Sequence, residues 1–255
     1  MGVHQKIDRI ARRQLTTLLQ PRQSFPSIQR ILHFEGNNGP DGVKRKSPSV
    51  DEPWHYIDPK KMHDVTLLDM INDHIINLAA ALRGDNQERA AFEAAWLAHA
   101  VVDGLTPAHH FPLAEKIEEL FGMPHHERLT VKQKNLIKGV GRRDTLAKNW
   151  EYWGGGGIFS SHVLFEFGVS ATMVGRRYTS VVTADDITDL TIRGYEVIYK
   201  DALATIDQLD LYDTFRIDGW NWRTARLVHT KLAPTLIKLV VLGWYTAIQA
   251  AGASR

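Results

Sequence analysis

The sequence predicts an all-α fold in a single domain, and three observations support this. Almost every long segment repeats its apolar residues at the three- and four-residue spacing of a helix, and only residues 178–182 read as a strand. The chain has 255 residues, 44% of them hydrophobic and 24% charged, which is enough for one sizeable core. It shows neither an internal repeat nor a linker between domains. We therefore expect one multi-helix bundle over residues 1–255.

The expected helices follow one another from the N-terminus. The first covers residues 5–19, where an apolar stripe runs from Ile7 to Leu18. Residues 35–48, rich in glycine, asparagine and proline, predict a loop, and Gly154–Gly157 predict a flexible break. The other helices are expected over residues 27–34, 61–83, 87–104, 113–121, 130–138, 144–150, 158–176, 184–209 and 222–250.

Composition narrows the partners and cofactors. The formal net charge of +2 is too small to require an acidic partner, and a chain without cysteine must hold any metal through nitrogen and oxygen. The N-terminal segment has no apolar core long enough for a secretory signal, so we expect a cytoplasmic protein. Residues 232–251 are apolar nearly all round, but Pro234, Lys238 and Gln249 favour a buried central helix over a membrane span.

The most informative stretch places two histidines and an aspartate within eleven residues, from His99 to His109. His99 and Asp103 are four residues apart, so on a helix they share a face that points into the core. An aspartate buried there is costly unless something neutralises it. Pro107 ends the helix, and His109 follows where it can reach a second ion. We expect a metal cluster, with a structural salt bridge as the alternative.

A second pair repeats this spacing. His162 and Glu166 again stand four residues apart on an expected helix, on a face shared with Phe159, Val163 and Phe167. Such pairs also form simple hydrogen bonds on helices, so one pair alone is weak evidence. Two inward-facing pairs in one small helical protein favour a metal site.

Three further residues complete the candidate set. His55 lies in a Trp-His-Tyr-Ile-Asp-Pro run, Asp41 in a Gly-Pro-Asp-Gly loop, and His4 at the head of the first helix. Nitrogen and carboxylate ligands suit zinc and other divalent first-row metals. His110 is the alternative to His109 as a ligand. The candidate metal ligands are His4, Asp41, His55, His99, Asp103, His109, His162 and Glu166.

The order of these ligands resembles the zinc-dependent phospholipase C family, whose all-helical fold is shared with the fungal-type single-strand nucleases. The resemblance covers most of the first two-thirds of the chain and implies a bundle around up to three zinc ions that cleaves a phospholipid or related phosphodiester. Four pieces carry it: Gly-Pro-Asp41, His55-aromatic-x-Asp-Pro, His99-x3-Asp103-x3-Pro107-x-His109 and His162-x3-Glu166.

Carried over residue by residue, the resemblance implies three zinc sites, two of which share Asp103. Glu166 matches the phospholipase branch, where the nuclease branch tends to have aspartate. The implied sites are Asp41, His55, His99 and Asp103; then His109, His162 and Glu166; and finally His4 with Asp103.

This chain departs from the family at the N-terminus. In the family, an N-terminal tryptophan contributes its amino group and carbonyl to the third site, whereas this chain begins Met1-Gly2. We expect the amino group of Gly2 to substitute if Met1 is removed, and otherwise a weak or absent third metal.

The cluster implies a hydrolytic mechanism. Paired metals lower the pKa of a shared water toward neutrality and gather the oxygens of a phosphate, and the water attacks phosphorus in line. We expect Asp41 to act as the general base if it is only loosely bound to metal.

Two other functions remain open from the sequence. One is a single-strand nuclease on the same fold, which would bind nucleic acid. The other is a non-catalytic, metal-binding helical protein with a degenerate site, which the altered N-terminus favours. A His-Asp phosphohydrolase ranks below both. That class needs an adjacent His-Asp dipeptide as metal ligands, and the dipeptide in this chain, His63-Asp64, has no matching partner ligands.

Four aromatic residues lie beside the metal motifs or the glycine run. Trp54, Trp150, Tyr152 and Trp153 are candidates for stacking on a head group or a nucleobase, with plain packing as the alternative. Basic clusters such as Arg142-Arg143 are usually solvated, but they also suit an anionic lipid surface. A phospholipid substrate and peripheral membrane contact are therefore the expected partners; the sequence does not indicate an oligomeric state.

Overall fold

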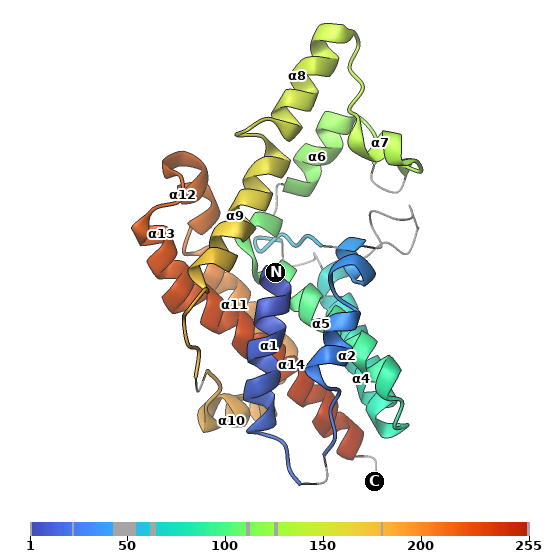
Figure 1. Ribbon diagram of the computed structural model, residues 1–255, viewed down its shortest axis with the longest axis vertical. Helices are drawn as coiled ribbons and strands as arrows, with labels where there is room; N and C mark the ends of the chain where they lie inside the picture. Colours follow the sequence, from blue (N-terminus) through green and yellow to red (C-terminus); the bar gives the residue numbers. More distant parts are fainter. Residues whose placement is uncertain are drawn as a thin grey trace.

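The fold is all-α, as the apolar periodicity predicts. The computed structural model describes residues 2–21, 23–42, 55–61, 65–110, 113–124, 127–179 and 181–253 (Figure 1). Within these ranges there is no strand. Ile57 and His110 form an isolated parallel β-bridge.

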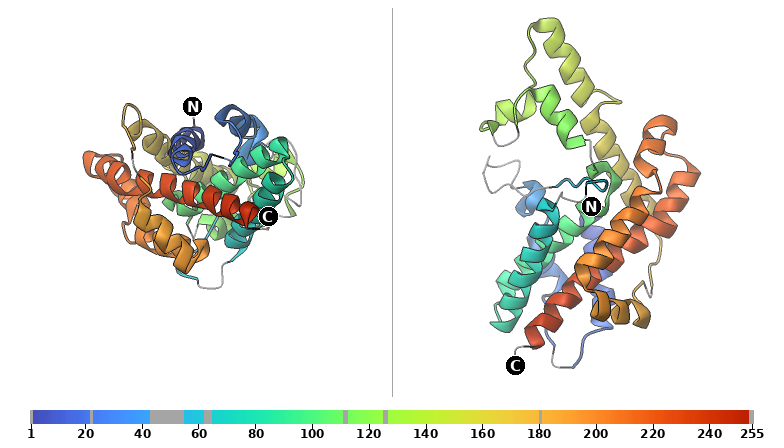
Figure 2. Two further views of the ribbon diagram at one scale, coloured as in Figure 1. Left: turned by 90° about the horizontal axis from the view of Figure 1, so that it is seen from below. Right: turned by 180° about the vertical axis from the view of Figure 1, so that it is seen from behind.

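Four helices form the core of the bundle. They are α1 (Val3–Thr16), α4 (Thr66–Arg83), α5 (Gln87–Leu105) and α14 (Ala233–Gly252). Figure 2 shows α14 running through the middle of the bundle, where it packs against the other three. The Trp244 Nε1 atom donates to the carbonyl of Ala94 at 2.8 Å, which ties α14 to α5 inside the core. Most of α5 is buried, so the side chains of its last turns are held in a dry environment.

Shorter helices surround this core. In Figure 1, α6, α7 and α8 project beyond the rest of the molecule; we call residues 113–153 the lobe. The other described elements are α2 (Ile28–His33), η1 (Gly36–Asn38), η2 (Pro107–His109), α6 (Leu113–Phe121), α7 (Val131–Asn135), α8 (Arg142–Trp153), α9 (Ile158–Thr172), α10 (Ala184–Arg193), α11 (Tyr195–Asp207), α12 (Leu211–Asp218), α13 (Trp222–Leu227) and the π-helical turn η4 (Val228–Leu232).

Two long helices expected from the sequence are interrupted. Residues 184–209 form two helices, because Gly194 takes a φ of 79° that breaks the α-helix between them. Residues 222–250 contain the π-helical turn immediately before Pro234, which has no N–H for the regular helical ladder. The helix α12 was not expected, and α4 begins five residues later than its expected start at residue 61.

The strand expected at residues 178–182 is wrong. The described positions there have no regular secondary structure, and two of their backbone polar groups bond to one side chain instead of to a neighbouring strand. Gln14 Nε2 donates to the Tyr178 carbonyl at 2.9 Å, and the Val181 N–H donates to Gln14 Oε1 at 3.3 Å. An alternation of apolar residues cannot distinguish these two ways of satisfying the backbone.

The apolar C-terminal helix lies in the core. Residues 222–252 are long and apolar enough to cross a membrane by length and composition alone. However, 67% of the most apolar window is buried inside the protein, against α1, α4 and α5. This segment therefore packs as a central helix of the bundle.

We predict that Gly104→Ala destabilises the protein by about 1–3 kcal/mol, because a Cβ there would lie 2.0 Å from the Tyr199 hydroxyl oxygen and 2.6 Å from Leu67. Tyr199→Phe removes that oxygen, which is buried without a hydrogen-bond partner among the described residues, and should by itself be nearly neutral. Urea unfolding of the single and double variants should show that Gly104→Ala costs less in the phenylalanine background. An equal cost in both backgrounds contradicts the packing described here.

We also predict a pH-dependent contribution from Asp186. Burial raises the pKa of this carboxyl, but hydrogen bonds from Lys238, at 2.6 Å, and from Thr183 outweigh it, so that the net shift is downward. The stabilisation is therefore present above the unfolded-state pKa and disappears as the pH falls through the lower folded-state pKa. Asp186→Asn should reduce the free energy of unfolding by about 1 kcal/mol at pH 7. Denaturation at a series of pH values should show this difference shrinking toward pH 3; a constant difference would contradict the pairing.

Candidate metal centre

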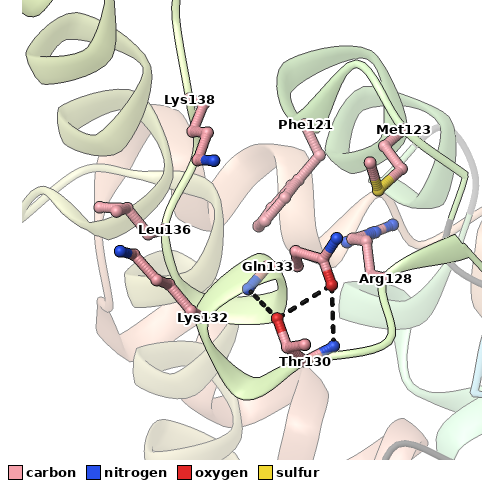
Figure 3. Close-up of a pocket in the computed structure, with 8 residues that line it drawn as sticks. All are labelled: Phe121, Met123, Arg128, Thr130, Lys132, Gln133, Leu136 and Lys138. Carbon is pink, nitrogen blue, oxygen red and sulfur yellow. Dashed lines mark hydrogen bonds between the residues drawn. The ribbon is translucent and has the colours of Figure 1, made fainter.

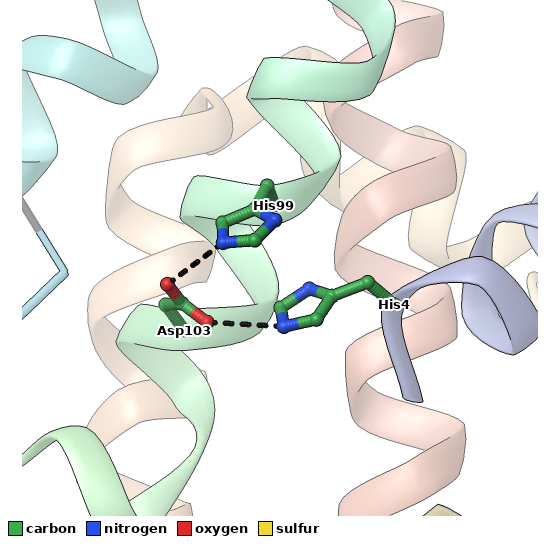
Figure 4. Close-up of side chains that lie close together, drawn as sticks. All are labelled: His4, His99 and Asp103. Atoms are coloured by element: carbon green, nitrogen blue, oxygen red, sulfur yellow. Dashed lines mark ion pairs between the residues drawn. The ribbon is translucent and has the colours of Figure 1, made fainter. Parts of the chain in front are cut away.

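The centre is built around the carboxylate of Asp103, in the last turn of α5. Its side chain is only 2% exposed. Figure 4 shows His4 and His99 directed at its two oxygens. The four histidine nitrogens nearest to it are His4 Nε2 at 3.3 Å, His55 Nδ1 at 2.5 Å, His99 Nε2 at 3.3 Å and His109 Nε2 at 3.5 Å.

Local structure brings these histidines together. The helix α5 ends at Leu105, Pro107 starts the short 3-10 turn η2, and this turn directs His109 back toward Asp103. The segment with His55 is held beside this turn by a hydrogen bond from the Ile57 N–H to the His109 carbonyl at 3.2 Å. At the N-terminus, α1 packs against α5 and places the ring of His4 on that of His99, with centroids 4.0 Å apart.

A second group lies next to Asp103 on the side of α9. His109 Nε2 and His162 Nε2 both lie 3.1 Å from the same oxygen of Glu166. The side chains of His162 and Glu166 are 16% and 27% exposed, so this group is more open than the first. His109 joins the two groups, because its Nε2 also approaches Asp103.

The pair on α9 is only partly directed into the core, and the apolar residues expected to share its inward face are exposed. Phe159, Val163 and Phe167 are 40%, 45% and 70% exposed. The core contacts of α9 come from Phe165 and Val169, which adjoin the pair on the other flank. His162 and Glu166 therefore lie at the border between the buried and the exposed faces of α9, where both are partly exposed.

Three sets of side chains have the geometry to hold metal ions. Within each set, one ligand atom per residue lies within 4.8 Å of the others. Asp41, with a half-exposed side chain 3.8 Å from His99 Nε2, is the most accessible member. The sets are His4, His99 and Asp103; Asp41, His55 and His99; and His109, His162 and Glu166.

Hydrogen bonds determine which nitrogen of each histidine is available. His109 Nδ1 donates to the His55 carbonyl at 2.9 Å, and His162 Nδ1 donates to the Ala108 carbonyl at 3.3 Å. Because a carbonyl cannot donate, both Nδ1 atoms must carry the proton. In a neutral ring, Nε2 then presents its lone pair to the carboxylate of Glu166. Two electron-rich atoms 3.1 Å apart require a positive charge between them, either a proton or a metal ion.

His99 shows the same arrangement in the interior. Its Nδ1 lies 3.3 Å from Glu35 Oε1, while its Nε2 lies 3.3 Å from Asp103 without hydrogen-bond geometry. Among the described residues, His99 Nε2 and His4 Nδ1 are buried and lack hydrogen-bond partners. A buried imidazole nitrogen that faces carboxylates without bonding to them fits a metal ligand, and the nitrogen and oxygen donors fit a divalent cation.

Electrostatics keep the carboxylates ionised. Burial raises the pKa of Asp103, but the nearby His109 and His99 outweigh burial and hold it well below its ordinary value. The pKa of Asp41 is also lowered, with His99 outweighing its partial burial. Burial lowers the pKa of His99, and Asp103 and Glu35 reverse this and raise it well above its usual value. A cation bound here would take the place of the protons on these histidines.

Glu35 is the functional residue that the sequence analysis missed. Its side chain is 3% exposed and supports His99 from the side opposite Asp103, while its other oxygen accepts from the Gly36 N–H at 3.2 Å. A carboxylate behind a ligating histidine orients the ring and strengthens it as a ligand. Glu35 opens a segment read only as a loop and stands 64 residues from His99, so no local spacing signals the contact.

The other candidate residues are placed as follows. His110 is turned away from the metal sets, since its Nε2 donates to the Gly104 carbonyl at 3.1 Å. Tyr152 and Trp153 form ring contacts with each other and with Phe159, and Trp150 is 76% exposed on α8. Their role in substrate binding stays a prediction. Trp54 and Met1 lie outside the described residues.

No protein-family model, curated protein or solved structure matches this chain. The geometry described above is therefore the basis for interpreting the centre.

We predict that Glu35→Gln weakens zinc binding at the sets containing His99 by about 10–100-fold, because the amide supports the imidazole less well. The set of His109, His162 and Glu166 should keep its affinity. Competition against a chromogenic zinc chelator measures both.

Glu93→Gln is the matched control. Glu93 is a fully buried carboxylate on α5, the helix that also carries His99. It lies 2.6 Å from His74 Nδ1 and belongs to none of the metal sets. A loss of zinc affinity in Glu93→Gln equal to that in Glu35→Gln would show that general destabilisation is responsible.

Proposed function

We propose that this chain is a metal-dependent phosphodiester hydrolase of the zinc-dependent phospholipase C type, acting on a phospholipid or a related phosphodiester. One observation carries the proposal: residues from distant segments converge on three adjoining metal sets, of which two share His99 and the third adjoins them through His109, 3.5 Å from Asp103. A single structural ion would need only one such set, whereas adjoining sets suit hydrolysis of phosphate esters.

The order of the ligands supports the same interpretation. The pieces that resemble the phospholipase C family supply every member of the three sets except His4. Glu166, the feature typical of the phospholipase branch, lies 3.1 Å from both histidines of its set.

Three side chains form the set for the third ion. His4, His99 and Asp103 form a set without any contribution from a terminal amino group. Three protein ligands are sufficient for a catalytic zinc site with an open position. Because His99 offers only Nε2, the first set and the set of Asp41 and His55 cannot both use it at the same time, and the proposed enzyme holds up to three zinc ions.

The chemistry divides between the bound ions and the protein. Bound zinc supplies positive charge for the phosphate oxygens and lowers the pKa of a coordinated water. Asp103 and Glu166 neutralise that charge, and the carbonyls of His55 and Ala108 hold the histidine rings in place. Asp41 is suited to accept the proton of the attacking water, because it is ionised, half-exposed and adjacent to His99.

The open side of the centre is consistent with a large substrate. Glu166 is accessible, and the exposed Phe159, Val163 and Phe167 adjoin it on α9. An apolar border beside a charged centre suits a phospholipid that is drawn from a membrane surface. We accordingly propose peripheral contact with a membrane and a cytoplasmic location.

We predict that Asp41→Asn lowers kcat for phosphodiester hydrolysis by about 10²–10⁴-fold through loss of the general base. Elemental analysis of zinc content shows whether the substitution also weakens a metal site, because Asp41 belongs to one of the sets. Asp189→Asn, which also replaces a solvent-accessible aspartate, serves as the control and should retain full activity. Full turnover by Asp41→Asn with normal zinc content would remove Asp41 from the mechanism.

Substrate class and metal dependence are tested together. The purified protein should contain about three zinc ions per chain, lose activity to a chelator and recover it when zinc is added. A phosphocholine ester should be hydrolysed faster than single-stranded DNA. The opposite preference would identify a nuclease, and full zinc occupancy with no hydrolysis of either substrate would identify a non-catalytic metal-binding protein.

A further inference from the structure

A pocket of about 340 Å³ lies in the lobe, between α6 and α7, and none of its lining residues belongs to the metal sets (Figure 3). This volume is at the lower end of the range for small-molecule sites. The lining residues that define its chemistry are Phe121, Met123, Arg128, Lys132, Leu136 and Lys138.

The polar part of the lining is cationic. Arg128, Lys132 and Lys138 line the pocket, and no aspartate or glutamate is among the lining residues. The surrounding sequence has the same bias, since residues 128–143 contain six lysines and arginines and no acidic residue. Glu127 and Asp144 flank this segment at its ends. A chain with a net charge of only +2 has therefore concentrated positive charge around this pocket.

Two features order the cationic side of the pocket: the burial of Arg128 and a capping box in the turn that carries Lys132. Arg128 is 5% exposed, and its guanidinium lies over the ring of Phe121, 4.4 Å from the centroid, so it is a fixed charge in the wall. Thr130 and Gln133 form a capping box at the start of α7: the Gln133 N–H donates to Thr130 Oγ1 and the Thr130 N–H donates to Gln133 Oε1. The capping box fixes the turn that carries Lys132.

The remaining surface is apolar. Phe121, Met123 and Leu136 line the pocket, and Leu136 is 41% exposed at its edge. One fixed and two exposed cations beside an apolar wall favour an anion attached to an apolar group over a free inorganic ion, because both parts of such a ligand are then matched. Arginine and lysine are the side chains that bind phosphate oxygens most effectively.

We propose that this pocket binds a phosphate group carried on a small apolar body. Arg128, Lys132 and Lys138 contact the phosphate, and Phe121 and Met123 contact the apolar part. The site is distinct from the metal centre, and the inference does not depend on the proposed hydrolase activity. A lipid phosphate and a nucleotide phosphate share this chemistry, and the experiment below separates them.

Methyl NMR of the full-length, zinc-loaded protein tests the proposal. Met123 is one of five methionines, and its ¹³C-labelled methyl group reports on the pocket itself, so binding at the metal centre is not mistaken for binding here. Met123→Leu assigns the signal. The probes are dihexanoyl phosphatidic acid, adenosine 5′-monophosphate, inorganic phosphate and the uncharged dihexanoylglycerol.

We expect a phosphomonoester probe to shift the Met123 signal and to bind at least about tenfold more tightly than inorganic phosphate or dihexanoylglycerol. The tighter of the two phosphomonoesters identifies the source as lipid or nucleotide. No shift of Met123 with any probe overturns the proposal. Equal binding of inorganic phosphate also overturns it, because the apolar wall would then contribute nothing. Equal binding of the uncharged lipid overturns it as well, because the cations would then contribute nothing.

The charge requirement is tested with matched variants. Lys132→Gln/Lys138→Gln removes two positive charges from exposed positions of the pocket and should weaken the phosphomonoester about tenfold or more. Arg176→Gln/Arg177→Gln removes the same charge from exposed positions outside the pocket and should change affinity less than twofold. An equal loss in both variants would show general electrostatic attraction and contradict a built site.

Discussion

The buried carboxylate of Asp103 is the group on which the organisation of the centre depends. An ionised aspartate with 2% exposure is too costly to leave unpaired, and four histidines approach it from α1, α5, η2 and the segment at residue 55. Its charge therefore adds to the helix packing and the Ile57–His109 hydrogen bond that bring these parts of the chain together. The carboxylate and the imidazoles make a set of side chains that could hold a metal ion.

Backbone carbonyls determine which nitrogen of two histidines faces the carboxylate of Glu166. The carbonyls of His55 and Ala108 accept from the Nδ1 atoms of His109 and His162, and this leaves both Nε2 atoms facing Glu166. Glu35 has the same effect on His99 from inside the bundle. Orientation by surrounding groups in this way distinguishes a prepared ligand set from a chance cluster of histidines.

The molecule separates its rigid and accessible parts. The α1, α4, α5 and α14 bundle holds His4, His99 and Asp103 in a dry core, while α9 brings His162 and Glu166 to an edge that solvent reaches. The lobe adds a cationic pocket with its own fixed walls. A rigid set of candidate ligands with one partly exposed edge keeps those side chains fixed while solvent still reaches them.

The sequence by itself determined the all-α class, the bounds of α6 and nearly those of α5, because apolar periodicity and the Pro107 break act locally. It also indicated the eight candidate ligands: a spacing of four residues placed two pairs on one helix face each, and the other four came from their position in motifs next to those helices. Only the tertiary structure decided that Glu35 supports His99, that Gln14 replaces a strand partner, and that Phe159 and Phe167 face solvent. The physical reason is the same in each case: these outcomes depend on which surfaces meet across long sequence separations, and a local pattern contains no information about that packing.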